Sequence, residues 1–170
     1  AFDEETKLIT QTEYVDPPLM FNDDYVYRGS MSKTMRDHFL DLSFYLKSTL
    51  LKYAYPEAKI LEIGSNDGVF IKNFSPNKTI AVEPCGNFAK YTQSKGYTTY
   101  PEFWTQELAD KINKKHGKQN IIFAANCICH IPDLDQTFSV VKSLLSKDGT
   151  FIFEDPSLAE VINNNSYDQI

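Results

Sequence analysis

The stretch Ile-Leu-Glu-Ile-Gly-Ser-Asn-Asp-Gly at residues 60–68 constrains the fold of this chain more than any other part of it. An apolar run ends at Gly64, small and polar residues follow, and a second apolar run begins after Gly68. This pattern predicts a strand, a tight glycine loop and the start of a helix. Such a loop lets the backbone approach a ligand closely and directs the N-terminal amides of the helix toward it.

A second predicted strand follows this loop and ends in an acid. Residues 79–83 read Thr-Ile-Ala-Val-Glu, so Glu83 lies at the end of the strand. A glycine turn after one parallel strand and an acid at the end of its neighbour are typical of a nucleoside site, in which the acid accepts hydrogen bonds from both ribose hydroxyls. An ordinary strand–turn–helix unit is the alternative, and the acid at this distance favours the nucleoside site.

The glycine spacing indicates which nucleoside is bound. A dinucleotide site requires Gly-x-Gly-x-x-Gly, because the pyrophosphate lies against bare backbone. Here Ser-Asn-Asp separates Gly64 from Gly68, and Asp67 would place a negative charge beside any phosphate. A ligand with an amino acid end and a sulfonium suits this loop, and we therefore expect S-adenosylmethionine. The predicted cofactor-binding residues are Glu62, Gly64, Ser65, Asn66, Asp67, Gly68, Glu83, Pro84, Phe103 and Asn126.

The apolar pattern divides the chain into a lead-in segment and an alternating core. Residues 1–29 show no clear period, whereas residues 30–53 predict an amphipathic helix of some six turns capped by Ser30 or Ser32. Strands and helices then alternate through residue 170, which predicts an α/β fold with a doubly wound, mostly parallel sheet. The predicted strands are 59–63, 79–83, 97–100, 120–125 and 149–154, and the predicted helices are 67–73, 86–95, 102–115, 134–146 and 157–163.

The composition excludes several classes of protein. Apolar residues make up 42% and charged residues 24% of the 170 residues, which suits one domain with a core. The net charge of −6 disfavours a nucleic-acid partner, because surfaces that follow a phosphate backbone are usually basic. No apolar run approaches the roughly 20 residues of a membrane span, and three cysteines make no disulfide framework. We expect a cytoplasmic chain with no membrane partner and, because it does not begin with Met, a piece of a longer polypeptide.

Four stretches together resemble one known family, the C-methyltransferases that act on nucleotide-linked 4-keto deoxysugars. The likeness extends over about residues 15–170, and residues 166–170 are similar to the run that leads into the family's catalytic segment. The glycine motif is shared by many methyltransferases, whereas the last two stretches are much more specific. The four stretches are Asp-Tyr-Val-Tyr-Arg-Gly-Ser at 24–30, Glu-Ile-Gly-Ser-Asn-Asp-Gly at 62–68, Ala-Asn-Cys-Ile-Cys-His-Ile-Pro at 125–132 and Phe-Glu-Asp-Pro at 153–156.

The resemblance implies a class I, Rossmann-like methyltransferase domain that uses S-adenosylmethionine to methylate ring carbon C3 of the sugar through an enolate. The class I fold has seven strands and only five are predicted here, so the final strands and the catalytic base are expected beyond Ile170. The family's upstream zinc module has no counterpart in this sequence. The implied partners are a nucleotide-sugar substrate and further domains of the same polypeptide.

Three residues are candidates for catalysis. The resemblance places Tyr27 and Tyr25 as candidate catalytic phenols, with packing of the lead-in against the sheet as the alternative. His130 follows the fourth predicted strand, at the carboxyl edge where ligands bind in such sheets. There it would orient the sugar or stabilise the enolate, unless it caps the following helix. Asn126, at the end of the same strand, is expected to meet the methionine part of the cofactor.

Other side chains near the predicted carboxyl edge have two readings each. Glu154 and Asp155 end the fifth strand and either line the sugar pocket or cap the helix that follows. Phe103, with Trp104 beside it, either forms the adenine wall or belongs to the core.

The Cys127-x-Cys129-His130 sequence has no second ligand pair, so no metal is predicted and both thiols are expected to be buried. Asp16-Pro17-Pro18 resembles the loop of base-specific amino-methyltransferases, but Leu19 replaces the aromatic residue, and this reading is rejected. An oxygen- or nitrogen-specific methyltransferase of the same fold and a non-catalytic cofactor-binding fragment stay open as alternatives.

Overall fold

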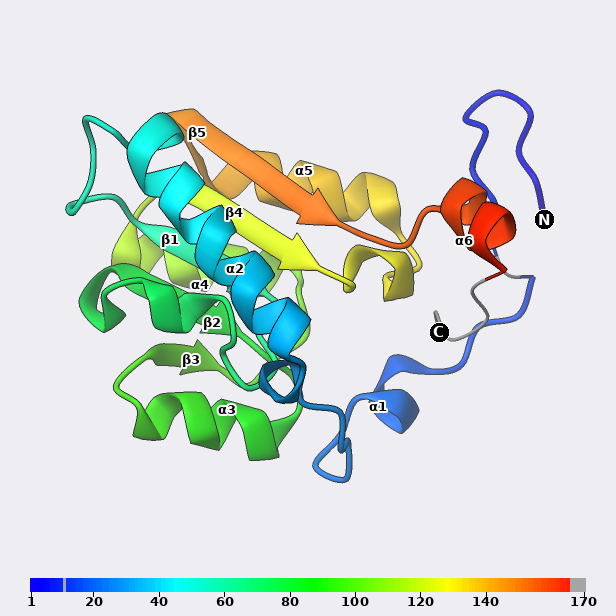
Figure 1. Cartoon of the computed structure of the whole chain (residues 1–170), viewed down its shortest axis with the longest axis horizontal. Coiled ribbons are helices and arrows are strands. Elements are labelled where there is room, and N and C mark those ends of the chain that lie inside the picture. Colours follow the sequence, from blue (N-terminus) through cyan, green and yellow to red (C-terminus); the bar gives the residue numbers. More distant parts are fainter. Residues whose placement is uncertain (11, 166–170) are drawn as a thin grey trace.

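The computed structural model describes residues 1–10 and 12–165 (Figure 1). Residues 166–170, part of the family resemblance, lie outside the described ranges. In chain order, the elements are α1 (Pro17–Met20), η1 (Gly29–Met31), α2 (Lys33–Tyr45), η2 (Leu46–Leu50), β1 (Ile60–Ile63), η3 (Ile71–Asn73), η4 (Pro76–Lys78), β2 (Thr79–Val82), α3 (Gly86–Ser94), β3 (Thr98–Tyr100), α4 (Gln106–His116), β4 (Gln119–Ala125), η5 (Ile128–His130), α5 (Leu134–Leu144), β5 (Leu145–Glu154) and α6 (Leu158–Asn164).

The five strands form one parallel sheet in the order β3-β2-β1-β4-β5. The order reverses at β1, so the chain first winds outward to β3 and then crosses to β4 and β5. The predicted doubly wound parallel sheet is therefore confirmed. In such sheets, ligands bind at the carboxyl ends of the strands on either side of the reversal. Here that point lies between β1 and β4 (Figure 1).

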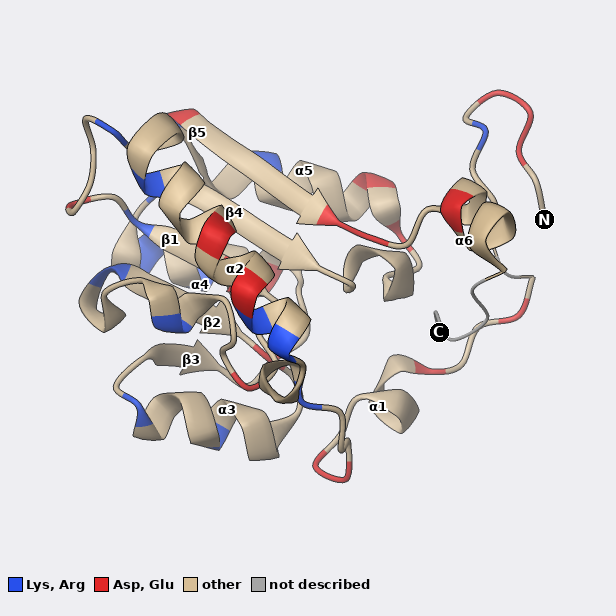
Figure 2. Ribbon diagram, in the orientation of Figure 1, with Lys and Arg blue, Asp and Glu red and all other residues tan. Residues whose placement is uncertain are grey.

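Charged side chains are unevenly distributed around this sheet (Figure 2). The lead-in, the end of β5 and α6 carry acidic residues, and all three lie on the side of the carboxyl edge. Lys and Arg are more frequent on α3, on α4 and at the amino ends of the strands. The carboxyl edge is therefore the more acidic side of the described chain.

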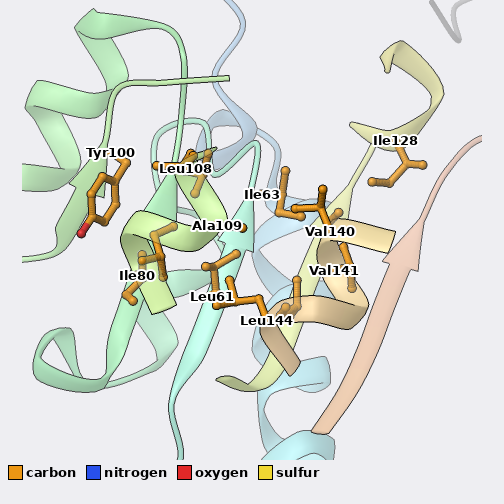
Figure 3. Close-up of a cluster of buried hydrophobic side chains, with 14 residues drawn as sticks. Leu61, Ile63, Ile80, Tyr100, Leu108, Ala109, Ile128, Val140, Val141 and Leu144 are labelled. Carbon is orange, nitrogen blue, oxygen red and sulfur yellow. The ribbon is translucent and has the colours of Figure 1, made fainter. Parts of the chain in front are cut away.

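Side-chain alternation along the strands builds two hydrophobic layers. Leu61 and Ile63 of β1 pack on one face with α4 and α5 (Figure 3). Ile60 and Glu62 point to the other face, which α2 and η3 cover. Because both faces are covered, β1 is buried along its whole length, as expected for a central parallel strand.

The helix predicted at 67–73 is wrong. The structure has only the short 3-10 turn η3 there. Asn66 and Gly68 have φ angles of 48° and 80°, which do not continue an α-helix. The side-chain amide of Asn73 donates to the Phe70 carbonyl at 3.0 Å and so occupies an acceptor that a longer helix would use. The expected row of helix N-terminal amides is therefore absent from this loop.

The helix predicted at 30–53 is shorter than expected. Ser32 is its cap, because its hydroxyl accepts a hydrogen bond from the Met35 amide at 3.3 Å. The α-helical part α2 has 13 residues and continues as the π-helical turn η2 to Leu50. None of the helices in the described ranges is long and apolar enough to cross a lipid bilayer.

The remaining predicted elements occur near their expected positions. The largest shifts are in α4, which begins at Gln106 instead of residue 102, and in β5, which begins at Leu145 instead of residue 149. Leu145 already pairs with Gln119 before a register irregularity in β4. The lead-in is more structured than expected, since it contains α1 and the start of η1.

Three buried aromatic rings support the layer between α2 and the sheet. Phe70 stacks on Phe123 with ring centroids 4.0 Å apart, and Phe39 meets both rings edge-on at 5.8 Å. Phe70 is fully buried. We expect Phe70→Ala to lower the free energy of unfolding by about 3–5 kcal/mol, measured by urea denaturation. Phe138→Ala is the control, since Phe138 is 40% exposed. An equal loss in both variants would contradict this account of the core.

Candidate active site

A cavity of about 760 Å³ opens at the carboxyl edge of the sheet. The loops after β1, β2, β3 and β4 and the lead-in segment form its walls. It brings together most of the predicted site residues. Those that line it are Tyr25, Tyr27, Glu62, Gly64, Ser65, Asn66, Glu83, Pro84, Phe103, Asn126 and His130, whereas Asp67, Gly68, Glu154 and Asp155 do not.

Gly64 is required at the turn that begins the glycine loop. Its φ angle is +69°, and a Cβ there would lie only 2.8 Å from the Sγ atom of Cys127. The Gly64 amide donates to the carbonyl of Val82 at 2.8 Å, which extends the pairing of β1 and β2 by one bond. The loop can therefore pass between β2 and the end of β4 only without a side chain at this position.

Glu83 connects the two loops on the cofactor side of the cavity. Its Oε2 atom accepts a hydrogen bond from the Asn66 amide at 2.6 Å, and its Oε1 atom accepts one from the Cys85 amide at 2.8 Å. Burial raises the pKa of this carboxyl, and the two amide bonds act in the opposite direction. Each oxygen keeps a free lone pair, so Glu83 can still accept hydrogen bonds from two ribose hydroxyls.

Two other polar groups of the cavity wall have no hydrogen-bond partner among residues 1–10 and 12–165. Glu62 is fully buried, and its Oε2 atom is unpaired, as is the hydroxyl of Ser65. Burial, and then the nearby Glu83, raise the pKa of the Glu62 carboxyl well above its usual value. An amino acid group supplies a donor for Glu62 and an acceptor for Ser65. Together with the diol site at Glu83, these residues fit S-adenosylmethionine, which supplies a methyl group on a sulfonium.

Asp67 and Gly68 face away from this cavity. The Asp67 carboxylate accepts hydrogen bonds from the amide and the hydroxyl of Ser30, at 3.2 and 2.5 Å. Gly68 has a φ angle of +80° and packs against Thr92 and Ile71. Direct cofactor contacts by these two residues stay a prediction, and the structure gives both a role in the loop itself.

Aromatic side chains of the lead-in gather beside His130 on one wall of the cavity. The Phe21 ring meets Tyr25 and His130 edge-on, with centroids 5.5 and 5.4 Å away. Tyr27 is more open, with 56% of its surface exposed. Tyr25, Tyr27 and His130 thus line the same cavity as Glu83. Their catalytic roles stay predictions.

Phe103 and Trp104 both line the cavity after β3. Trp104 also packs against the hydrophobic cluster under α4, so the two readings of this pair are compatible. The indole Nε1 of Trp104 is buried without a partner. Because it is the one tryptophan in the sequence, its fluorescence reports directly on this wall.

In the segment after β4, the burial of the thiols differs from the prediction. The strand ends at Ala125, and residues 128–130 form the turn η5, so strand alternation does not apply to Cys127 and Cys129. Cys129 is exposed, contrary to expectation. Partial burial and the neighbouring Asp155 raise its pKa to about 12, which keeps the thiol protonated at neutral pH. In the described ranges, no group of three His, Cys, Asp or Glu residues is arranged to hold a metal ion.

The remaining predicted residues lie at the rim. Glu154 accepts hydrogen bonds from the Nε2 atom of His38 at 2.8 and 2.9 Å, and its carbonyl accepts the Asn126 amide at 2.7 Å. Asp155 lies beside Cys129, with its carboxylate 3.4 Å from the Cys129 amide. Neither acid reaches the cavity, although Pro156 does.

Sequence reasoning missed the contribution of α1. Asp16, Pro17, Pro18 and Phe21 all line the cavity. The signal was present, because proline at the first helical position marks a helix start. A four-residue helix has too few residues to show a period, so its place over the sheet could not be read from the pattern.

Glu62 makes stability depend on pH. The pKa of the Glu62 carboxyl is higher in the folded chain than in the unfolded one, so the folded chain binds the proton more tightly. The free energy of unfolding therefore falls as the pH rises above the pKa that Glu62 has in the unfolded chain. We expect Glu62→Gln to be more stable than the parent at pH 8, with a difference that shrinks toward pH 5 by at most about 1.4 kcal/mol per pH unit. Thermal melts across this range measure it. The exposed Glu13→Gln is the control, and a constant difference would contradict the burial argument.

Glu83 should contribute directly to cofactor affinity. We expect Glu83→Ala to weaken binding of S-adenosylhomocysteine by about 1–3 kcal/mol, because two ribose hydroxyls lose their acceptor. Calorimetric titration measures the dissociation constant. Glu107→Ala on the exposed side of α4 is the control. An unchanged dissociation constant in Glu83→Ala would remove this residue from the site.

Comparisons with solved structures agree with this fold. The plantazolicin methyltransferase BpumL in complex with a pentazolic analog and SAH has a TM-score of 0.62 at 11% identity, covering 81% of this chain and 54% of that one. The CurJ carbon methyltransferase has a TM-score of 0.56 at 18% identity, covering 79% and 39%. An S-adenosylmethionine-dependent methyltransferase from Clostridium acetobutylicum has a TM-score of 0.51 at 18% identity, covering 65% and 48%. At these identities the likeness establishes the fold alone.

Sequence comparisons establish the family. C-methyltransferase NovU of Streptomyces niveus is 33% identical over 113 residues, which cover 65% of this chain and 27% of NovU. The matched part of this chain thus corresponds to only 27% of the length of this curated relative. Residues 27–170 match a family described as a methyltransferase domain. The chain therefore belongs to the methyltransferase domain family, and the Glu62 and Glu83 side of its cavity fits S-adenosylmethionine as the cofactor.

Proposed function

We propose that this domain transfers a methyl group from S-adenosylmethionine to carbon C3 of a nucleotide-linked 4-keto deoxysugar. The observation that carries the proposal is that one cavity joins the Glu83 side to a wall of Tyr25, Tyr27 and His130. A cofactor held at Glu83 would present its reactive end toward these three side chains. The wall then serves the acceptor molecule.

Two sequence observations support carbon as the acceptor atom. The relative NovU is named a C-methyltransferase. The stretches at 24–30, 125–132 and 153–156 resemble sugar C-methyltransferases, and the first two supply Tyr25, Tyr27 and His130. Since the chain covers 27% of NovU, the activity and the sugar substrate are inferences about a larger protein.

The proposed reaction needs an acceptor carbon made nucleophilic by a neighbouring carbonyl. A base removes the proton at C3, and the electron pair moves toward the C4 oxygen to form an enolate. The carbonyl re-forms as C3 takes the methyl group, and the pair of the broken carbon–sulfur bond stays on sulfur. Both Tyr27 and His130 line the cavity. We propose that they donate hydrogen bonds to the developing oxyanion or orient the ring. We propose that the base comes from a further part of the same polypeptide.

The charge of the cavity limits how a nucleotide sugar would bind. Among the described residues that line it, the acids are Asp16, Glu62 and Glu83, and there is no Lys or Arg. A diphosphate would be repelled inside this cavity. The sugar ring therefore enters, and the nucleoside diphosphate lies outside it. The acidic carboxyl edge (Figure 2) also favours a small-molecule partner over a nucleic acid.

The position of the transferred methyl group tests the proposal. In the polypeptide that carries this domain, a 13C-labelled methyl donor and a nucleotide-linked 4-keto deoxysugar should give a methyl signal bonded to a ring carbon. A label on oxygen or nitrogen would instead support the alternative reaction.

We expect Tyr27→Phe to lower kcat by about 10²–10³-fold with little change in cofactor affinity, because its hydroxyl acts on the acceptor. Tyr53→Phe is the control, since Tyr53 is 94% exposed and lies on the turn after η2.

A further inference from the structure

The two stretches 24–30 and 62–68, far apart in the sequence, form one hydrogen-bonded unit. We call residues 25–30 the strap. The side-chain carbonyl of Asn66 accepts the Gly29 amide at 3.0 Å, and its side-chain NH2 donates to the Tyr27 carbonyl at 2.9 Å. The same carbonyl also accepts the Asp67 amide at 2.8 Å, so the partners fix the orientation of the amide group. One side chain thus holds the backbone on both sides of Arg28.

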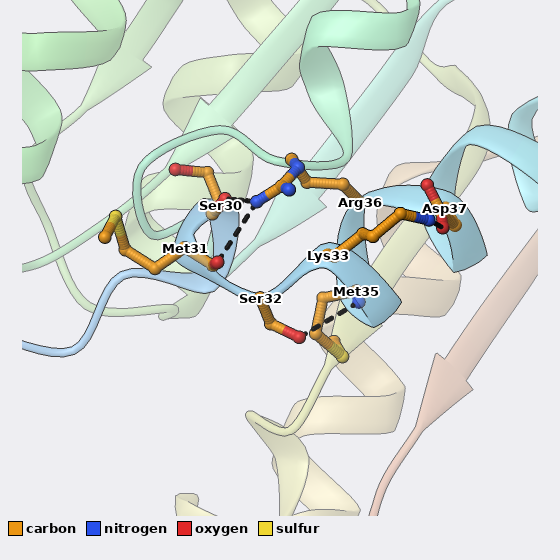
Figure 4. A network of polar contacts seen from close by, with 7 residues as sticks. All are labelled: Ser30, Met31, Ser32, Lys33, Met35, Arg36 and Asp37. Atoms are coloured by element: carbon orange, nitrogen blue, oxygen red, sulfur yellow. Dashed lines mark hydrogen bonds and ion pairs between the residues drawn. The ribbon is translucent and has the colours of Figure 1, made fainter.

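Ser30 anchors the end of the strap from two directions. Its amide and hydroxyl donate to the Asp67 carboxylate of the glycine loop. From the opposite side, Arg36 of α2 donates to the carbonyls of Ser30 at 2.6 Å and Met31 at 3.1 Å (Figure 4). Bonds to charged groups are stronger than bonds between neutral groups, so this end of the strap is held firmly.

The start of the strap is attached to α3. The Asn87 side chain donates to the Tyr25 carbonyl at 3.0 Å, and the Arg28 guanidinium lies over the Phe88 ring, 5.1 Å from its centroid. These contacts leave the side chains of Tyr25 and Tyr27 to line the cavity. The strap therefore places the two tyrosines by its backbone, through side chains of the glycine loop and α3.

Asn66 also contacts the cofactor side of the cavity through its backbone. Its amide donates to Glu83 at 2.6 Å, while its side chain binds the strap. With a φ angle of 48°, Asn66 directs its backbone amide to Glu83 and its side chain to the strap. A cofactor that binds Glu83 therefore stabilises the conformation of the residue that holds Tyr27.

We infer that Asn66 is a positioning residue that couples cofactor binding at Glu83 to placement of the strap tyrosines, with Asp67 and Ser30 as the second point of attachment. This inference rests on the proposed function, because it takes Glu83 as the ribose acceptor and the tyrosines as the acceptor wall. The cofactor then orders the wall before the methyl acceptor enters. By linkage, an ordered strap must strengthen cofactor binding by the same factor.

Ser30→Ala tests the coupling outside the cavity, because Ser30 does not line it. The variant removes the hydroxyl bond to Asp67, and we expect amide hydrogen exchange in residues 25–31 to become about two- to tenfold faster without ligand. Trp104 fluorescence measures the dissociation constant of S-adenosylhomocysteine, and amide exchange measures how strongly the bound ligand slows exchange in the strap. We expect Ser30→Ala to raise the dissociation constant by about the same factor by which it reduces this slowing. Ser94→Ala, which removes a local bond to the Tyr91 carbonyl, is the control.

Asn66→Gly tests the same coupling at its centre. Glycine keeps the positive φ angle and the backbone bond to Glu83 but removes both bonds to the strap. We expect faster exchange in the strap and, at saturating S-adenosylhomocysteine, loss of the protection that the ligand gives the parent chain. Asn165→Gly is the matched control, since Asn165 has a φ angle of 50° at the end of α6.

Three outcomes separate the inference from the proposed function. Unchanged strap exchange in both variants without ligand would overturn the attachment of the strap through Asn66 and Asp67. Faster exchange with unchanged affinity for S-adenosylhomocysteine in Ser30→Ala would overturn the coupling. Failure of the parent chain to bind S-adenosylhomocysteine would count against the cofactor site itself, and the exchange rates without ligand would still decide whether Asn66 and Asp67 hold the strap.

Discussion

The Glu83 carboxylate and its two backbone amides are the interaction on which the site depends. The Asn66 amide comes from the loop after β1 and the Cys85 amide from the loop after β2, at the point where the ladder between the strands has ended. A buried carboxylate that accepts two amide bonds holds both loops in a fixed relation. The positive φ angles at Gly64 and Asn66 are tolerated because this anchor determines them. The strap in turn attaches to the same loop.

Buried acids at this edge serve ligand binding at a cost in stability. Burial, and then the nearby Glu83, raise the pKa of Glu62, which also has an unpaired oxygen among the described residues. A chain optimised only for stability would place apolar groups there. The described lining of the same cavity has no Lys or Arg, so a cationic cofactor there would meet these acids without competition from a basic side chain. Under the proposed function, the acidic interior binds the cofactor and the aromatic wall receives the methyl acceptor.

The sequence predicted the position of an element correctly where a short residue pattern is compatible with only one kind of element. The runs at β1, β2 and β4 were located within about one residue, since buried parallel strands read as continuous apolar segments. The prediction failed at 67–73, where apolar Phe70 and Ile71 suggested a helix although two positive φ angles prevent one. It also failed for Cys129, which was expected to be buried but lies exposed in the turn that follows the end of β4 at Ala125. These errors arose where tertiary contacts override local preference.

The sequence by itself determined the parallel sheet, the glycine turn and the acid at the end of β2. Each depends on local chemistry, namely an apolar run, a residue without Cβ and a carboxylate at a strand end. Only the tertiary structure decided that Asp67 faces Ser30, that Asn66 links Glu83 to the strap, and that α1 forms a wall of the cavity. Such contacts join residues about 40 positions apart. The partner of a polar side chain at that separation depends on how the whole chain packs, and no local pattern contains that information.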